Sequence, residues 1–206
     1  MQKLHTRNMT RIALLSVLAG ILHLRMFRFP LPFMPPIMDY DLSGIPEMVS
    51  AFTMGPGAGV ITVILKNMVK MVMEGPSPAV TGEIQNIILS SVYLLTATYI
   101  FQLGKKSRNF ALIGMIVGAF ATAAVAVFTN MYFIIPFYSM AMGFTMESVI
   151  EMTRMVNPFV TGPATFIALG IVPFNLIKGS LTALFGYLTY PMLMRIAGGD
   201  GKHAVQ

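Results

Sequence analysis

The 206-residue chain contains no cysteine, and only 11% of its residues are charged. The absence of cysteine excludes a disulfide framework, thiol catalysis and cysteine metal sites. The only histidines are His5, His23 and His203, which lack metal-ligand spacing, so no metal site is predicted. A soluble domain of this size would normally carry about a quarter charged residues. The shortage of charge therefore argues against a soluble protein.

The chain is instead rich in apolar sequence. Hydrophobic residues make up 55% of it, and its mean hydropathy is +0.72. Several apolar stretches reach the roughly 20 residues that a helix needs to cross a hydrocarbon core. The first eleven residues are polar and basic, but no small-residue cleavage site follows, so no cleavable signal peptide is predicted. These features indicate a multi-pass membrane protein.

Prolines and glycines divide the apolar sequence. Prolines at positions 30, 32, 35 and 36 lack amide donors and disfavour helix before them, which predicts an extended outer loop over residues 27–41. Pro173 is predicted to break or kink the last helix. The expected fold is all-α, a single membrane domain over residues 1–206. Its six helices are predicted at about 10–27, 44–54, 58–73, 81–103, 110–135 and 166–196, with an interfacial helix at about 145–156.

Basic residues predict the orientation, because lysine and arginine are enriched in cytoplasmic loops. With both termini in the cytoplasm, most basic residues fall on the inner side, and Arg25 and Arg28 are exceptions. The net charge of +6 is attributed to this bias, since nothing in the chain resembles a nucleic-acid module. The basic residues placed inside are Lys3, Arg7, Arg11, Lys105, Lys106, Arg108, Arg195 and Lys202.

Lys178 is the only charge in the apolar run from Phe166 to Met194. Ionisable groups inside membrane spans usually face a cavity, a partner or the interface. Asn175 lies three residues earlier, so the two side chains share one helix face. Together they suit a ligand rich in carbonyl and hydroxyl groups. The alternative left open is that Lys178 extends to the interface or pairs with an acid elsewhere in the bundle.

Further polar residues fall in the outer halves of the fourth and fifth predicted helices. Glu83 and Asn86 again share a face, and Asn130 lies on the fifth helix. Glu83 could instead be an N-terminal helix charge that the macrodipole favours. Asn130 could form an interhelical hydrogen bond.

These groups converge below the proline-rich loop, which predicts an outward-facing cavity with that loop as its cap. Its aromatic and methionine side chains are suited to pack on a flat ring, although the loop could also be only an interfacial anchor. No nucleotide loop, metal motif or nucleophile–base arrangement is present, so no catalytic residue and no cofactor are predicted. The capping side chains are Phe29, Phe33, Met34, Met38 and Tyr40.

Five segments together resemble the riboflavin-specific S components (RibU type) of energy-coupling factor (ECF) transporters. The resemblance extends over about residues 10 to 196 and is most specific in the first and last of these segments. The segments are FPLPFMPPIMDYDLSGIPEM, GPGAGVITVILKN, GEIQN, TNMYFIIPFY and PFNLIKG.

The resemblance implies a prokaryotic plasma-membrane protein that captures riboflavin from outside and delivers it inward. A membrane T component and two ATPase subunits would supply the energy, and riboflavin would be a transported ligand. Asn175 and Lys178 would bind its polar groups, and Tyr40 and Asp41 would close over it. Glu83, Asn86 and Asn130 are further implied contacts. Binding of flavin mononucleotide (FMN) is left open.

The family docks on its T component through small residues spaced by four on the first helix. Here Ala13 is followed by Val17 at that spacing, so the predicted docking residues are Ser16, Ala19 and Gly20. Three alternatives remain open. They are a stand-alone carrier driven by an ion gradient, an S component for another vitamin, and an assembly factor without a small ligand.

Overall fold

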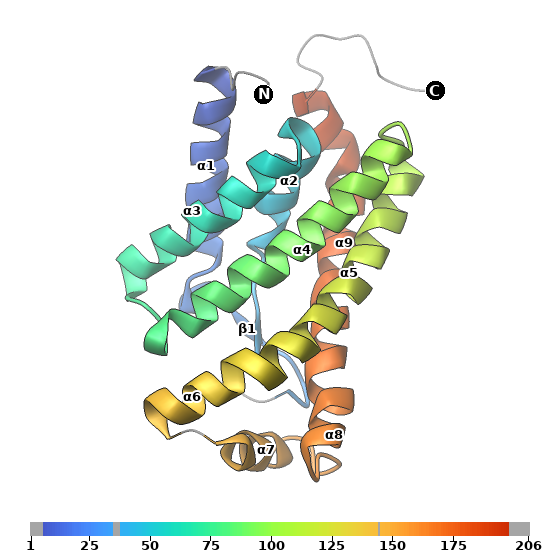
Figure 1. The fold of residues 1–206 in the computed structure, drawn as a ribbon. Helices are drawn as coiled ribbons and strands as arrows, with labels where there is room; N and C mark the ends of the chain where they lie inside the picture. The colour runs from blue at the N-terminus through green and yellow to red at the C-terminus, as the bar shows by residue number, and fades with distance from the viewer. Residues whose placement is uncertain (1–5, 35–37, 144, 198–206) are drawn as a thin grey trace.

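The computed structural model describes residues 6–34, 38–143 and 145–197, and this part of the chain is almost entirely helical, which confirms the all-α prediction (Figure 1). The predictions for Lys3, Lys202, Pro35 and Pro36 lie outside the described residues. The α-helices are α1 (Thr6–Leu22), α2 (Gly44–Met54), α3 (Pro56–Glu74), α4 (Thr81–Leu103), α5 (Arg108–Thr129), α6 (Ile135–Met142), α7 (Met146–Arg154), α8 (Pro163–Phe166) and α9 (Val172–Ala197).

Shorter elements connect these helices. The 3-10 turns are η1 (Arg25–Phe27) and η2 (Pro78–Val80). Two π-helical segments, η3 (Asn130–Ile134) and η4 (Ile167–Ile171), join α5 to α6 and α8 to α9 without a break. Strands β1 (Phe29–Pro30) and β2 (Asp39–Tyr40) pair antiparallel, with Phe29 opposite Tyr40.

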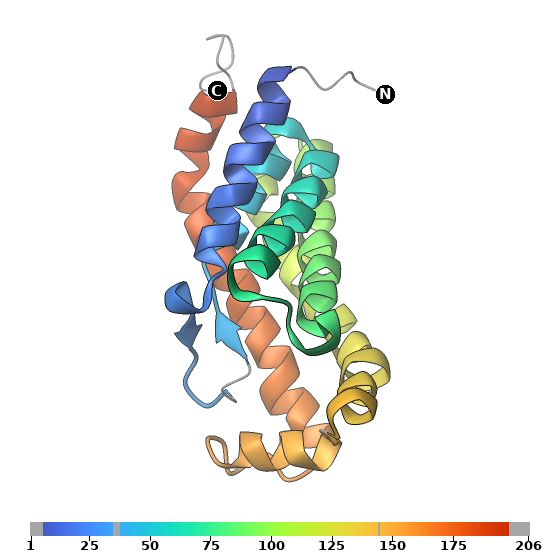
Figure 2. The same cartoon turned by 90° about the vertical axis from the view of Figure 1, so that its left-hand side faces the viewer.

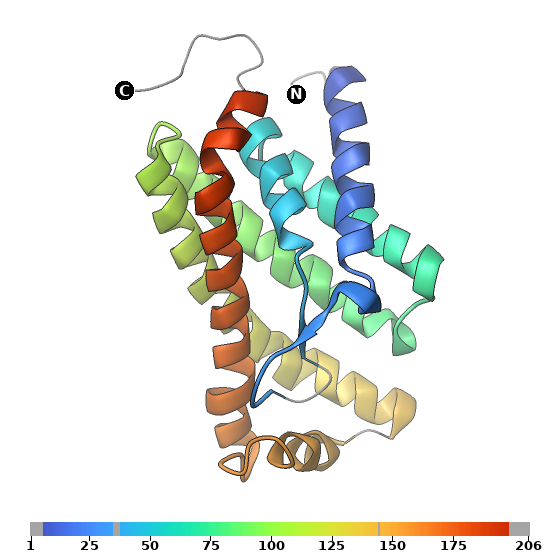
Figure 3. The ribbon, with the colours of Figure 1, turned by 180° about the vertical axis from the view of Figure 1, so that it is seen from behind.

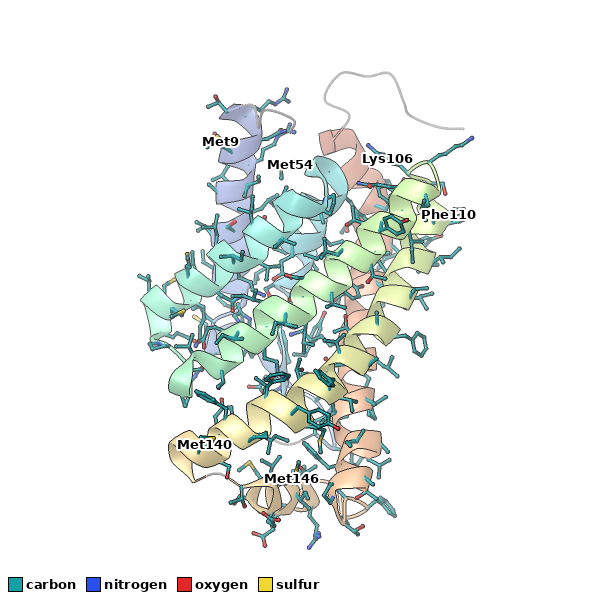
Figure 4. All side chains as sticks on the ribbon, viewed as in Figure 1. Met9, Met54, Lys106, Phe110, Met140 and Met146 are labelled. Atoms are coloured by element: carbon teal, nitrogen blue, oxygen red, sulfur yellow. The ribbon has the colours of Figure 1, made fainter. Side chains whose placement is uncertain are left out.

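The helices run between two ends of an elongated bundle. The first turn of α1 and the last turns of α9 lie at one end, and α6, α7 and α8 lie at the other (Figures 1 and 2). Figure 4 places Met9, Met54, Lys106 and Phe110 near the first end and Met140 and Met146 near the second. Helix α7, which covers most of the predicted interfacial segment, lies across the second end.

Four helical stretches among the described residues are long and apolar enough to cross a membrane: Pro56–Glu74, Thr81–Leu103, Arg108–Met140 and Pro163–Pro191. Helices α1 and α2 are shorter, with 17 and 11 residues. Large apolar side chains such as Val72, Phe120 and Leu188 point outward and are more than half exposed. Such an outer surface suits contact with lipid, and the protein is a multi-pass membrane protein.

Local sequence explains the helix boundaries. Gly55 has φ of +102°, a conformation that glycine adopts without strain, and Pro56 then begins α3 at a position that needs no amide donor. Helix α1 ends at Leu22, before the predicted 27, because the chain tightens into η1 on its way to the prolines. The chain is not broken at Pro173, where a break or kink was predicted. The π-helical segment η4 precedes this residue, and α9 continues through it.

Two buried apolar clusters form the core and leave the site between them. The first joins α2, α3, α4, α5 and α9, where Phe52 and Phe101 stack with ring centroids 4.6 Å apart. The second joins α5, α6, α7, α8 and η4 around Phe166 and Ile171. The cavity described below is lined by members of both clusters, so packing on two sides fixes its walls.

Helices α4 and α5 pack closely because Gly114 of α5, which has no side chain, lies directly against the backbone of α4. A Cβ atom at Gly114 would lie only 2.5 Å from the carbonyl oxygen of Ala97. We expect Gly114→Leu to destabilise the bundle by about 1–3 kcal/mol, since backbone cannot move aside as a side chain does. Circular dichroism melts of the detergent-purified protein would measure this.

The matched control is Gly57→Leu, because a Cβ atom at Gly57 meets nothing within 4 Å. That variant should melt within a few degrees of the wild type, given that exposed substitutions usually change stability by about 0.5 kcal/mol or less. Equal melting shifts for the two variants would contradict the close-packing argument.

Candidate functional site

A cavity of about 330 Å³ opens among the helices in the half of the bundle that faces α6 and α7. Its lining comes from α2, α3, α4, α5, η3, α6, α7, α8 and α9, from residues that follow α1, and from the capping segment (residues 29–34 and 38–41). Within the capping segment only Met38, Asp39 and Asp41 line the cavity, so the predicted packing of Phe29, Phe33 and Met34 on a ligand is not supported by the lining. Figure 3 shows the capping segment between α1 and α9, in front of the helices behind it. Small-molecule sites typically have volumes of about 300–1,000 Å³, so the size suits a small ligand.

The structure brings six of the seven predicted ligand-binding residues to this cavity, although they are widely separated in the sequence. Tyr40 is the exception: it is buried, at 5% exposure, but is not part of the lining. Whether any of these residues contacts a ligand stays a prediction. The six in the lining are Asp41, Glu83, Asn86, Asn130, Asn175 and Lys178.

Lys178 is paired with the capping segment. Its Nζ lies 3.1 Å from Oδ2 of Asp41, whose side chain is 2% exposed. The backbone amide of Ser43 donates to the other carboxylate oxygen at 2.9 Å, and the Ser43 hydroxyl donates to the same atom. Two alternatives were left open for Lys178, and in the structure it pairs with an acid. That acid, Asp41, also lines the cavity.

Charge and burial oppose each other at Asp41. Burial raises the pKa of this carboxyl, but the Lys178 ammonium and the neighbouring His23 lower it by more, so the pKa lies well below its usual range. His23 Nδ1 is 3.3 Å from Asp41 Oδ2. Burial and the Lys66 ammonium lower the pKa of His23 to about 4, so its imidazole is neutral at neutral pH. The fixed charges here are therefore Asp41 and Lys178.

The network continues away from the cavity through α2 and α3. Lys66 Nζ donates to the Ser43 hydroxyl at 3.1 Å and forms an ion pair with Glu47. Lys66 and Glu47 are 1% and 2% exposed. A charge this deeply buried needs its partner, so this pair holds α2 against α3 and supports Ser43 beneath Asp41.

A second ion pair lies on the α4 side of the cavity. Glu83 Oε1 accepts from Lys70 Nζ at 2.6 Å and from the Ser77 amide at 2.9 Å. Glu83 therefore joins the start of α4 to α3 and to the loop between them. It also lines the cavity together with Lys70.

Three asparagines present amide groups from three helices. Asn130 and Asn175 each donate through Nδ2 to a backbone carbonyl four residues earlier, at 2.7 and 2.8 Å. Their oxygens accept no hydrogen bond from the described residues and can accept one from a ligand. Asn86 instead accepts from Asn67 at 3.1 Å, which orients its amide NH₂. Amides offer both donors and acceptors, as a ligand of mixed polarity requires.

Several polar residues of the lining were not predicted from the sequence, among them His23, Ser43, Ser90, Tyr93, Thr122 and Thr182. Helical spacing could have found some of them. Ser90 and Tyr93 continue the face of Glu83 and Asn86 at steps of three or four residues, and Thr182 follows Lys178 by four. Among the residues described, no group of three potential metal ligands is close enough to hold an ion.

The predicted docking residues on α1 are buried inside this chain. Ser16 and Ala19 are 1% and 0% exposed, and a Cβ atom at Gly20 would lie 2.5 Å from Val69 of α3. The small residues therefore allow close packing of α1 on α3, and a partner reaches them only if those helices separate. The exposed apolar residues of α1 include Leu14, Val17, Leu18 and Ile21.

Comparisons with known proteins give one family. The family described as ECF transporter, substrate-specific component, matches residues 7–190. Riboflavin transporter RibU of Staphylococcus aureus (strain TCH60) is 28% identical over 193 residues, covering 93% of this chain and 94% of that protein. Riboflavin transporter FmnP of Bacillus subtilis (strain 168) is 25% identical over 181 residues, covering 86% and 87% of the two chains.

A solved structure agrees with the family. The S component of a bacterial ECF transporter superposes with a TM-score of 0.71 at 26% identity, over 92% of this chain and 96% of that one. The family is a transporter component and not an enzyme, which confirms the prediction from the missing catalytic motifs. Because the match extends over nearly the whole sequence, this chain belongs to the substrate-specific components of ECF transporters.

Proposed function

We propose that this protein is the riboflavin-binding subunit of an ECF-type importer in a prokaryotic plasma membrane. The observation that carries the proposal is the convergence of Asp41, Asn130, Asn175 and Lys178 on one cavity beneath the capping segment. The names of the relatives, which are riboflavin transporters, support this ligand over another vitamin.

The lining suits the chemistry of a flavin. A flavin ring is flat and largely apolar, and one edge carries carbonyl oxygens and an N–H group. Met38, Leu89, Phe166 and Phe174 supply apolar surface in the cavity. The Asn175 amide and the Lys178 ammonium supply polar groups for the ring edge or the hydroxyl chain, while Asp41 sits over the site as part of its cap.

The same proposal includes the partners and the orientation. A T component and two ATPase subunits would supply the energy, in keeping with a family named for one component of a transporter. Six membrane crossings with both termini in the cytoplasm would put the exposed Lys105 and Lys106 inside and the capping segment outside. FMN, which differs from riboflavin by a phosphate, is a second ligand to be tested in the same assay.

The visible absorption spectrum of detergent-purified protein tests the ligand. We expect a flavin band to remain after purification, and added riboflavin to lose fluorescence on binding to protein stripped of ligand. Protein that neither retains nor quenches riboflavin would exclude the proposal. The other vitamins of this importer class, added under the same conditions, are the controls for specificity.

Reconstitution distinguishes the importer from a carrier that works alone. Vesicles that contain only this chain should bind riboflavin without accumulating it. Accumulation driven by an ion gradient in those vesicles would support the stand-alone carrier instead.

A further inference from the structure

The floor of the cavity lies where α4, α5 and α9 approach one another. A Cβ atom at Gly179 would lie 2.5 Å from Ala119 Cβ, and one at Gly118 would lie 3.0 Å from the Tyr93 carbonyl oxygen. The Tyr93 hydroxyl also donates to the Gly179 carbonyl at 3.1 Å. These contacts close the inner end of the cavity and leave little freedom for its walls.

Two hydroxyl-bearing residues of the lining, Ser90 and Thr122, belong to two of the helices that form this floor. Gly114 lies against Ala97, and Gly118 lies against Tyr93. The two helices are antiparallel, so moving four residues forward along α5 moves the contact four residues back along α4. The next step puts Thr122 beside Leu89 and Ser90. Ser90 and Thr122 both line the cavity, so adjacent helices bring their side chains to the same place.

Most buried helical threonines hydrogen-bond a backbone carbonyl, whereas Thr122 and Thr98 do not. Thr62, Thr153 and Thr182 each donate to the backbone carbonyl four residues earlier, at 2.9, 2.7 and 2.9 Å. Thr122 is 8% exposed, and its hydroxyl has no hydrogen-bond partner in the described part of the chain. Ser90 likewise makes no hydrogen bond to any described residue. Buried hydroxyls are rarely left without partners, so Thr122 calls for one that the protein alone does not supply. Ser90 is partly buried and adds a second hydroxyl to the same lining.

We propose that the Ser90 and Thr122 hydroxyls hydrogen-bond a polar group of the bound ligand and so act as specificity determinants at the floor of the site. The inference rests on the proposed riboflavin binding. Rotation about χ1 exchanges the Thr122 hydroxyl with its methyl group, and threonine uses two such rotamers in helices. A hydroxyl both donates and accepts, so the pair fits a carbonyl, an N–H or a hydroxyl on the ligand.

The proposal also explains discrimination. A ligand with only apolar atoms at this end would leave both hydroxyls buried without partners. A site built to bond polar groups rejects ligands that lack them, because the unpaired groups remain desolvated. The floor would therefore select for a polar group at one end of the ligand, in addition to the selection made by Asn175 and Lys178.

The test is Thr122→Val, which removes the hydroxyl and keeps the shape. We expect riboflavin affinity to fall about three- to tenfold, in the range of one neutral hydrogen bond. The melting temperature of the ligand-free protein should stay the same or rise, because an unpartnered buried hydroxyl is lost. Thr122→Ser should retain the affinity, and Ser90→Ala should lower it in the same way.

Thr98→Val is the matched control. Thr98 is 1% exposed and also has a hydroxyl without a partner, but it lies outside the lining. Like Thr122→Val, Thr98→Val should leave the melting temperature unchanged or raise it. Unlike Thr122→Val, it should leave riboflavin affinity unchanged. Wild-type affinity in both Thr122→Val and Ser90→Ala would overturn the inference, as would parallel losses of affinity and melting temperature. Failure of the wild type to bind riboflavin would instead exclude the proposed function.

Discussion

Lys178→Met is expected to weaken riboflavin binding by about tenfold to a hundredfold, which corresponds to roughly 1.5–3 kcal/mol for a hydrogen bond from a charged donor. The substitution removes the ammonium from the cavity wall and keeps much of the apolar side chain. It also removes the lysine partner of Asp41, a capping-segment residue whose side chain is 2% exposed. Titration of riboflavin fluorescence against purified protein gives the affinity.

Asp41→Asn and the double variant separate the two effects of losing Lys178. If Lys178 contacts the ligand, Lys178→Met/Asp41→Asn should regain thermal stability, since no unpaired carboxylate remains, and should still bind weakly. A double variant with wild-type affinity would assign the loss to Asp41 and its position in the cap. Unchanged affinity in Lys178→Met alone would remove Lys178 from the binding site.

Lys66→Met is expected to destabilise the protein by about 3–5 kcal/mol, the cost of leaving one member of a buried ion pair without the other. Glu47 would be left without its lysine partner at 2% exposure between α2 and α3. The Ser43 hydroxyl would also lose the Lys66 donor that lies 3.1 Å away. Circular dichroism melts in detergent should show a fall of many degrees.

Two controls make this result specific. Lys66→Met/Glu47→Gln should recover much of the loss, because neither side chain then carries an uncompensated charge. Lys105→Met removes a lysine from an exposed turn and should melt like the wild type. Melting of Lys66→Met close to that of Lys105→Met would show that the buried pair does not hold α2 against α3.

Much of the fold could be predicted because the signals are local. The break before α3 follows from Gly55 and Pro56, whose backbone preferences act within one or two residues. The apolar stretches indicate helices because backbone groups in lipid must bond within their own segment. The π-helical segments η3 and η4 were not predicted as such, although each ends two residues before a proline, Pro136 and Pro173, which lacks the amide donor of a regular helix.

The candidate site was predictable only as separate helix faces. The spacing of Asn175 and Lys178, and of Glu83 and Asn86, puts each pair on one face. This spacing does not predict which helix faces lie against one another in the folded bundle. The Lys178–Asp41 contact joins residues 137 positions apart, and the two acids at 41 and 83 have different lysines as partners. A hydroxyl without a partner, as at Thr122, is likewise invisible until every neighbour is placed.

The sequence by itself determined that this is a multi-pass helical membrane protein, that the chain breaks between α2 and α3, and which polar residues lie in apolar segments. It also indicated the family, through motifs that survive at low identity. The tertiary structure alone decided that Lys178 is paired with the cap, that Ser16, Ala19 and Gly20 are buried where α1 packs on α3, and that Ser90 and Thr122 line the same cavity. Backbone preferences and hydropathy act over a few residues, whereas ion pairs, close approaches and cavities form only when distant segments meet.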